Sequence, residues 1–310
     1  MKTVFQWMFC LLTFVGAAGL ASAQQHADVA LQQQVEAIVA QHLGKVAFFA
    51  KDLKTGATLA INANVPVQTA SVIKVPILVE AMYEVKAGKH KLDERLKLTK
   101  ENQVPGSGVL TELQPGLELT LEDALTLMIV VSDNTATNLA IDDVGIPAVN
   151  ARITQMGLKN TYLYKKVFMP PVGPTPADQR QFGLGKTTAR EMAEILESIE
   201  RCDLGDKPLC DKMIDMLKNQ QDHESMPRYI ESSDTTVATS AIAHKTGAED
   251  DVRNDVGIVY TRRGPIVISA FTYDNKDQSW TVDNSAEILI GKLTKAVVDA
   301  WAPRSDPGTK

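Results

Sequence analysis

Ser71-Val72-Ile73-Lys74-Val75-Pro76 is the stretch that decides the fold, because it places a hydroxyl and an amine three residues apart in an apolar segment. The residues around Lys74 are apolar on most sides of a helix, so we predict a buried helix that Ser71 opens. Pro76 is compatible with this helix because it lies near the helix start. On such a helix Ser71 and Lys74 share one face, about one turn apart, and the amine reaches the hydroxyl.

This pair has the chemistry of a serine nucleophile activated by an amine. A serine at a helix N-terminus also lies in positive potential, which favours an anionic oxygen. Lys74 acts as a base only if burial and a neighbouring cation lower its pKa. By average residue usage, an S-x-x-K pattern arises about once by chance in a chain of this length. The assignment therefore needs support from other motifs.

Ser132-Asp133-Asn134 supplies part of that support. Ser132 can relay a proton to a leaving nitrogen, and Asn134 offers both donors and an acceptor to a substrate amide. We expect Asp133 to point inward and to hold the loop by hydrogen bonds. The alternative is a simple helix-breaking turn, because these three residue types favour turns and caps.

Lys-Thr-Gly occurs twice in the chain. Lys54-Thr55-Gly56 falls in a predicted hairpin turn, and we interpret it as structural. In the second copy, which follows a β-rich run, Lys245 can bind a substrate carboxylate and lower the pKa of the first lysine. Thr246 can donate to the same carboxylate, and Gly247 allows a substrate backbone to lie close to the strand. The three motifs in this order predict formation of an acyl-enzyme from an amide carbonyl.

The remaining pattern predicts a mixed fold, α/β plus all-α. β-rich runs occupy 46–50, 57–61, 241–246, 255–260 and 266–273, and helical patterns occupy 119–139, 188–200 and 285–301. The simplest packing joins the terminal strands in one antiparallel sheet, with a helical lobe inserted between them. Residues 164–186 are rich in Pro and Gly and show no clear periodicity. Loops of this length are often functional.

The chain predicts one exported catalytic domain. Lys2, the apolar run after it and Ala21-Ser22-Ala23 predict a signal peptide over residues 1–23, and thus a secreted or periplasmic protein. No later run reaches the roughly 18 apolar residues of a membrane helix. We expect a catalytic domain over 24–303 and a disordered tail over 304–310. Within the domain we predict an α/β lobe from 24–70 and 225–303, and a helical lobe from 71–224.

Charge, cysteines and histidines limit the partners. A net charge of −6, without a basic patch interleaved with aromatics, argues against nucleic acid. Cys202 and Cys210 can close a small loop in an oxidising compartment, but geometry decides this, so a disulfide and two free thiols both stay open. The five histidines show no metal-ligand spacing, so we predict no metal and no cofactor. We expect a monomer.

On these residues, the chain resembles the class A β-lactamases. The resemblance covers nearly the whole mature chain and includes 127–139 and 186–193 beside the three motifs. It implies a β-lactamase/transpeptidase-like fold, in which a five-stranded antiparallel sheet with flanking helices is paired with an inserted helical domain. It also implies that Ser71 is acylated and that the backbone N–H groups of Ser71 and Ala248 form the oxyanion hole. The position of Ala248 depends on the strand register.

The chain departs from this family in the loop before Lys186. Class A β-lactamases carry a glutamate there, which positions the deacylating water. This sequence has no carboxylate between Asp143 and Asp178, so Asp178 is the nearest candidate base. A general base contributes about 10²- to 10⁴-fold. We therefore expect acylation to survive and deacylation to slow.

Three functions are compatible with these observations. The favoured one is a serine hydrolase that β-lactams acylate at Ser71 and that hydrolyses the β-lactam amide, with slow deacylation. The second is a penicillin-binding-protein-like D,D-peptidase or esterase, which would act on a D-Ala-D-Ala-like peptide and be inhibited by β-lactams. The third is a β-lactam-binding sensor, for which the sequence offers no spanning segment or partner domain.

Overall fold

The computed structural model describes residues 29–303, except 175, 232–233 and 235–240. The predicted signal peptide over 1–23 and the predicted tail over 304–310 lie outside the described residues. No helix within the described ranges is long and apolar enough to cross a membrane.

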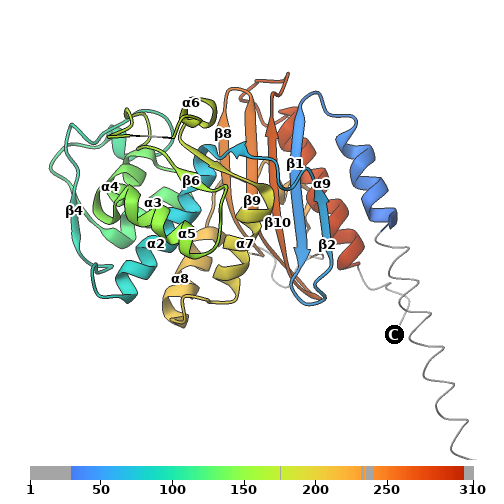
Figure 1. The fold of residues 1–310 in the computed structure, drawn as a ribbon, viewed down its shortest axis with the longest axis horizontal. Helices are drawn as coiled ribbons and strands as arrows, with labels where there is room; N and C mark the ends of the chain where they lie inside the picture. The colour runs from blue at the N-terminus through green and yellow to red at the C-terminus, as the bar shows by residue number, and fades with distance from the viewer. Residues whose placement is uncertain (1–28, 175, 232–233, 235–240, 304–310) are drawn as a thin grey trace, which may run out of the picture.

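A five-stranded antiparallel sheet organises one half of the molecule (Figure 1). Its order is β2-β1-β10-β9-β8, so strands from both ends of the chain pair side by side. The strands are β1 (Lys45–Asp52), β2 (Thr58–Ile61), β8 (Ile242–Glu249), β9 (Val252–Thr261) and β10 (Gly264–Tyr273). The predicted sheet is confirmed. The first Lys-Thr-Gly copy lies in the connection between β1 and β2, as we interpreted it.

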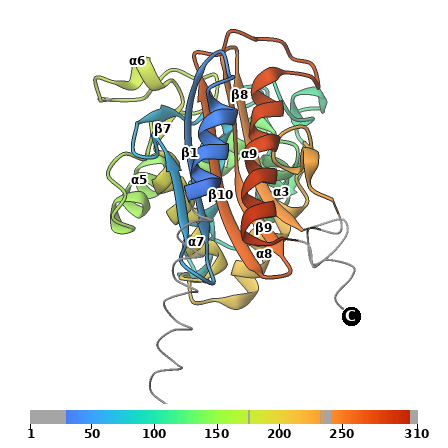
Figure 2. The ribbon, with the colours of Figure 1, turned by 90° about the vertical axis from the view of Figure 1, so that its right-hand side faces the viewer.

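Both faces of the sheet are buried, so apolar side chains of β1 and β10 point to both faces. In β1, Ala47 and Phe49 pack into one core, while Phe48 and Ala50 alternate with them and pack into the other. Figure 2 shows α9 (Ser285–Trp301) and the helical segment 29–39 lying against one face. On the other face, α7 (Ala189–Glu200) packs against β1, β9 and β10, and α8 (Lys207–Lys218) packs against β8.

The helices of the other half of the molecule pack around a central one, α2, whose residues are buried on most sides. They are α2 (Lys74–Lys86), α3 (Leu121–Val130), α4 (Asn134–Val144), α5 (Ile146–Gln155), α6 (Gln179–Phe182), α7 (Ala189–Glu200) and α8 (Lys207–Lys218), with 3₁₀ turns η1 (Ala70–Ile73), η2 (Leu110–Glu112) and η3 (Met226–Tyr229). Five short strands accompany them: β3 (Val67–Gln68), β4 (Arg95–Lys97), β5 (Glu118–Thr120), β6 (Tyr162–Leu163) and β7 (Gly185–Thr187). The lobe boundaries stay a prediction.

The helical pattern over 119–139 divides into two helices. Thr120 and Asp123 form a capping box at the start of α3. Leu119 belongs to β5 instead of the helix. The helix stops before Ser132, and the Asp133 side chain caps α4 by accepting from the N–H of Ala136. The break thus places the Ser132 triplet between two helices.

The segment before α7 contains more structure than its sequence pattern predicts. It forms α6 and β7, and β7 pairs with both β3 and β6. This small sheet ties the loop to the residues just before the nucleophile turn. Farther along, a disulfide joins Cys202, in the connection that follows α7, to Cys210 in the first turn of α8.

Candidate active site

Ser71 lies in η1, the tight turn that leads into α2. Ala70, immediately before it, adopts a positive φ of 43°, a conformation that non-glycine residues rarely take. Such strained backbone persists only when surrounding contacts enforce it, and it concentrates at functional sites. The turn places Ser71 half-buried on the wall of a cleft.

Lys74 lies beneath this turn and is completely buried. Its Nζ donates to the backbone oxygen of Ser132 at 2.7 Å, to Ser132 Oγ at 3.0 Å and to Asn134 Oδ1 at 2.9 Å. Burial, and next the charge of Lys245, lower the pKa of Lys74 well below its usual range. The direction and both causes are those that a base at this position requires.

The Ser132 triplet is held as a rigid turn. Ser132 has a positive φ of 55°, and it presents its hydroxyl to Lys74. Asp133 points inward, as expected, since its Oδ2 accepts from the N–H groups of Val109 and Leu110 at 2.7 and 2.9 Å. Its carboxylate therefore organises the loop, while Ser132 and Asn134 line the cleft.

The second Lys-Thr-Gly copy forms part of β8, on the opposite side of the nucleophile. Lys245 is completely buried, and burial lowers its pKa to about 8. A Cβ on Gly247 would lie 2.8 Å from the carbonyl oxygen of Thr69 and 3.0 Å from the Ser71 nitrogen. Only glycine allows the strand to approach the nucleophile turn this closely. Thr246, Gly247 and Ala248 all line the cleft.

Asn254, which was not among the predicted site residues, holds the same turn from β9. Its Nδ2 donates to the carbonyl oxygens of Gln68 and Thr69, at 3.0 and 3.2 Å. The side chain thus fixes the backbone that precedes Ser71. No local pattern marks Asn254, because its partners lie about 185 residues earlier in the chain.

These residues surround a cleft of about 1030 Å³. Six of the predicted site residues line it: Ser71, Ser132, Asn134, Thr246, Gly247 and Ala248. Lys74 and Lys245 lie below its surface, where their charges interact. The volume is within the range of small-molecule sites. The three motifs, far apart in sequence, are therefore brought to one cavity.

Among the described residues, those of the loop that line the cleft include no acid. Val167 lines the cleft there and is buried. Its N–H donates to Asn138 Oδ1 at 2.8 Å, and its carbonyl oxygen accepts from Asn138 Nδ2 at 3.0 Å. This pair of hydrogen bonds fixes the loop against α4. An apolar side chain thus lines the cleft at a position that α4 holds in place.

Asp178, our candidate base, does not line the cleft. Its Oδ1 accepts from the Tyr164 hydroxyl at 2.8 Å, and its Oδ2 pairs with Lys186 Nζ at 2.6 Å. The hydrogen bond from Lys186 is the main reason that the pKa of Asp178 is lowered. A carboxylate stabilised in this way is a weaker base. These contacts give Asp178 a part in holding the loop.

One group of potential metal ligands occurs among the described residues, away from the cleft. His90, Glu94 and Asp143 bring their ligand atoms within 4.8 Å of one another. His90 Nδ1 is already paired with Glu94 at 2.8 Å and with Asp143 at 3.0 Å. The absence of a metal stays a prediction.

Comparison with known proteins agrees with this geometry. The model of the beta-lactamase enzyme family matches residues 30–301. The chain belongs to the beta-lactamase enzyme family. Beta-lactamase CARB-3 of Pseudomonas aeruginosa is 25% identical over 278 residues, which are 89% of this chain and 91% of the relative. The class A resemblance is therefore confirmed.

Solved structures of beta-lactamase family members share the fold. A beta-lactamase from Sphaerobacter thermophilus superposes with a TM-score of 0.75 at 32% identity, covering 87% of this chain and 96% of the other. A variant of PBP-A, solved as an acyl-enzyme complex with penicillin G, superposes with a TM-score of 0.73 at 27% identity, covering 88% and 96%. The β-lactamase/transpeptidase-like fold is confirmed.

Proposed function

We propose that this family member is a serine hydrolase that β-lactams acylate at Ser71. The observation that carries the proposal is the buried Lys74 amine, which contacts Ser132 Oγ and has a lowered pKa. In this mechanism Lys74 accepts the Ser71 proton as Oγ attacks the lactam carbonyl. Ser132 passes a proton to the lactam nitrogen as the C–N bond breaks.

The substrate is positioned from β8. Lys245 and Thr246 bind its carboxylate, and Asn134 contacts its side-chain amide. The backbone N–H groups of Ser71 and Ala248 stabilise the carbonyl oxygen as it becomes negative. The cleft lining of Thr246 and Ala248 supports these roles, as does the approach of Gly247 to the Ser71 nitrogen. We also propose export to an oxidising compartment, which the Cys202–Cys210 disulfide supports.

A second candidate is a D,D-peptidase of the penicillin-binding type. Val167, rather than an acid, lines the loop wall, so release of the acyl group lacks a base on that side. The acyl-enzyme complex of the PBP-A variant with penicillin G shows that a relative of this fold forms such an adduct. Acylation is common to both candidates, and the fate of the adduct separates them.

The test is to mix purified protein with penicillin G and follow both substrate concentration and protein mass. We expect a one-to-one adduct on Ser71, followed by turnover that is limited by its release. Ser71→Ala must form no adduct. A persistent adduct together with cleavage of a peptide ending in D-Ala-D-Ala would favour the second candidate. An unmodified wild-type protein would rule out both.

A further inference from the structure

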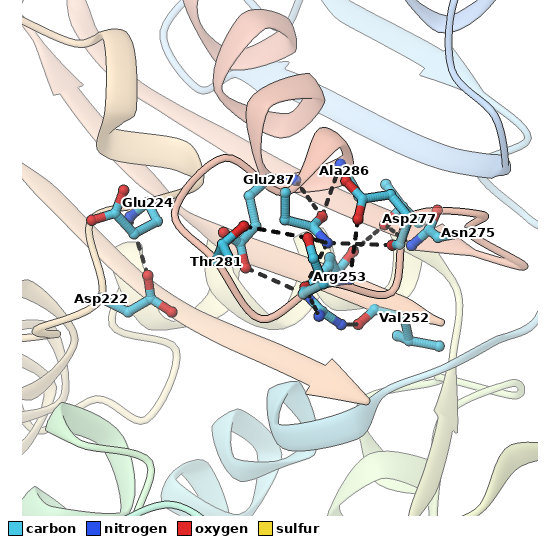
Figure 3. A network of polar contacts seen from close by, with 12 residues as sticks. Asp222, Glu224, Val252, Arg253, Asn275, Asp277, Thr281, Ala286 and Glu287 are labelled. Atoms are coloured by element: carbon cyan, nitrogen blue, oxygen red, sulfur yellow. Dashed lines mark hydrogen bonds and ion pairs between the residues drawn. The ribbon is translucent and has the colours of Figure 1, made fainter. Parts of the chain in front are cut away.

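Four carboxylate residues line the cleft among the residues that the structure describes. They are Asp222, Glu249, Asp250 and Asp251. Asp222 lies in the loop that follows α8, where its Oδ1 accepts from the Glu224 N–H at 3.1 Å (Figure 3). Asp250 and Asp251 form the tight connection between β8 and β9. Glu249, the last residue of β8, is the carboxylate that follows the second Lys-Thr-Gly copy on the same strand.

The alternation of β8 places Glu249 on the reactive face. Side chains two residues apart leave a strand on the same side. Lys245 is on the side that interacts with Lys74, and a Cβ built on Gly247 would contact the Ser71 turn. Glu249 continues this row, one step beyond Gly247. It also follows directly after Ala248, whose N–H we assign to the oxyanion hole.

The Glu249 carboxylate extends toward the wall that has no base. A Cβ on Gly183 of that wall would lie 3.9 Å from Glu249 Oε1. Lys165, another residue of the wall, interacts electrostatically with the same carboxylate. The group therefore lies between the end of β8 and the loop, in the cleft that Val167 also lines.

The backbone of Glu249 is anchored while its carboxylate stays open. The buried guanidinium of Arg253 donates through Nη1 to the carbonyl oxygens of Glu249 and Val252, and it packs 4.3 Å from the ring of Trp280. Figure 3 shows Arg253 within this network, between Val252 and Glu287. Within the described residues, no hydrogen bond or ion pair engages the Glu249 carboxylate. Asp178 differs, since both its oxygens are engaged.

We propose that Glu249 is the general base for deacylation, a role that rests on the proposed acylation of Ser71. A water molecule attacks the acyl carbonyl carbon, and its proton passes to the Glu249 carboxylate. The tetrahedral intermediate then breaks the bond to Ser71 Oγ, and that proton returns to the departing oxygen. The products are the free acid and the regenerated serine. The base acts from the β8 side of the cleft.

The local environment of Glu249 suits this role. Partial burial of the carboxyl group, and next the negative charge of Asp251, raise the pKa of Glu249. A raised pKa makes the carboxylate a stronger base. The residue is exposed at the cleft, so water reaches it.

The experiment measures formation and decay of the penicillin adduct separately, by mass spectrometry of rapidly quenched samples. Glu249→Gln should acylate at nearly the wild-type rate and deacylate about 10²- to 10⁴-fold more slowly. Glu249→Asp should restore part of the rate. Asp251→Asn retains the base but removes a neighbouring negative charge, so it should move the acid limb of the deacylation profile to lower pH. A purely structural role for Glu249 would not produce that shift.

Every other outcome rejects either the role of Glu249 or the proposed acylation of Ser71. If Glu249→Gln forms the adduct and releases it as fast as wild type, Glu249 is not the base and the proposed acylation stands. A wild-type adduct that never decays leads to the same conclusion. If Glu249→Gln is poorly folded by circular dichroism, the Asp251→Asn profile decides, and an unmoved acid limb rejects the role. Absence of any wild-type adduct rejects the proposed function itself.

Discussion

The two walls that face Ser71 differ in what their side chains are arranged to do. On the helical side, Lys74, Ser132 and Asn134 form a buried, hydrogen-bonded group. On the loop side, the apolar Val167 lines the cleft, and the nearest acid in sequence, Asp178, pairs with Lys186 and does not line it. Attack on the substrate and release of the product are thus supported by different parts of the molecule.

This difference teaches that the two half-reactions are separable in the structure. The groups for acylation come from segments that contact one another directly through side chains. A base for deacylation has to reach the acyl carbon from the loop or from the end of β8. Changes on the helical side should therefore alter adduct formation, and changes on the loop side should alter adduct lifetime.

The largest expected effect comes from Lys74→Met, which removes the amine and retains most of the side-chain volume. Without a base for Ser71, acylation by penicillin G should fall by about 10²- to 10⁴-fold. Stopped-flow mixing followed by mass spectrometry measures the rate. Three acceptors lose the buried donor, so the unfolding midpoint should fall while the protein stays folded. A cooperative thermal unfolding transition is the control, and unchanged acylation would show that another group activates Ser71.

A comparable effect of opposite sign is expected on the loop wall. In the Glu249→Gln background, Val167→Glu should place a carboxylate in the cleft, because the Asn138 hydrogen bonds hold that backbone in position. Deacylation should accelerate by up to about 10²- to 10⁴-fold, with acylation nearly unchanged. The decay of the isolated adduct measures this.

Val167→Gln in the same background is the matched control. It has similar size and polarity and offers no base, so its adduct should persist. If the glutamine variant accelerates decay as much as the glutamate variant, polarity or loop loosening explains the gain. The walls would then differ in water access instead of in base chemistry.

The two Lys-Thr-Gly copies allow a smaller test of positioning. A Cβ at Gly247 would crowd the Thr69 carbonyl and the Ser71 nitrogen. Gly247→Ala should shift the nucleophile turn, and a displacement of about 1 Å can cost 10²-fold in rate. Gly56→Ala is the matched control, since no atom lies within 4 Å of its Cβ position.

Gly56 has a φ of 79°, so alanine there should lower stability by about 1–2 kcal/mol and leave acylation unchanged. Adduct formation and thermal unfolding of the two variants separate site geometry from general stability. Equal acylation rates in both variants would show that the close approach of β8 is not needed for catalysis.

The sequence predicts the acylation side well because its signals are local or paired by short spacing. Ser71, in η1, and Lys74, the first residue of α2, are three residues apart, and Thr120 with Asp123 caps α3. The strands of the sheet were likewise visible as β-rich runs. Even α5, which we did not predict, shows apolar residues at helical spacing in Val149 and Ile153. Such patterns follow from the periodicity of the element.

The deacylation side is not readable in this way, since it depends on contacts between distant segments. Asn138, on α4, donates a hydrogen bond to the Val167 carbonyl oxygen in the loop. Asn254, on β9, donates one to the Thr69 carbonyl oxygen, far earlier in the chain. Glu249 reaches the cleft only through the register of β8. Asp178 was chosen as the nearest acid in sequence, but Lys186 and Tyr164 engage its carboxylate elsewhere. Nearness in sequence does not give nearness to the nucleophile.

The smallest expected effect is that of Asp178→Asn, which tests this last distinction. If Asp178 only holds the loop, the variant should deacylate at about the wild-type rate. Its ion pair with Lys186 is partly exposed, so its loss should lower stability by only about 0–1 kcal/mol near neutral pH. Mass spectrometry of the adduct and thermal unfolding measure the two effects.

The lowered pKa of Asp178 determines how the stability difference between wild type and Asp178→Asn changes with pH. The pKa of Asp178 is lower in the folded protein than in the unfolded chain, so its stabilising contribution is present above the unfolded pKa. That contribution disappears as the pH falls through the folded pKa. The unfolding midpoints of wild type and Asp178→Asn should therefore differ near neutral pH and converge in acid. Lys186→Met should behave similarly, because it removes the other partner of the pair. A strongly prolonged adduct in Asp178→Asn, but not in Lys186→Met, would instead show that Asp178 acts as a base in deacylation from the loop side.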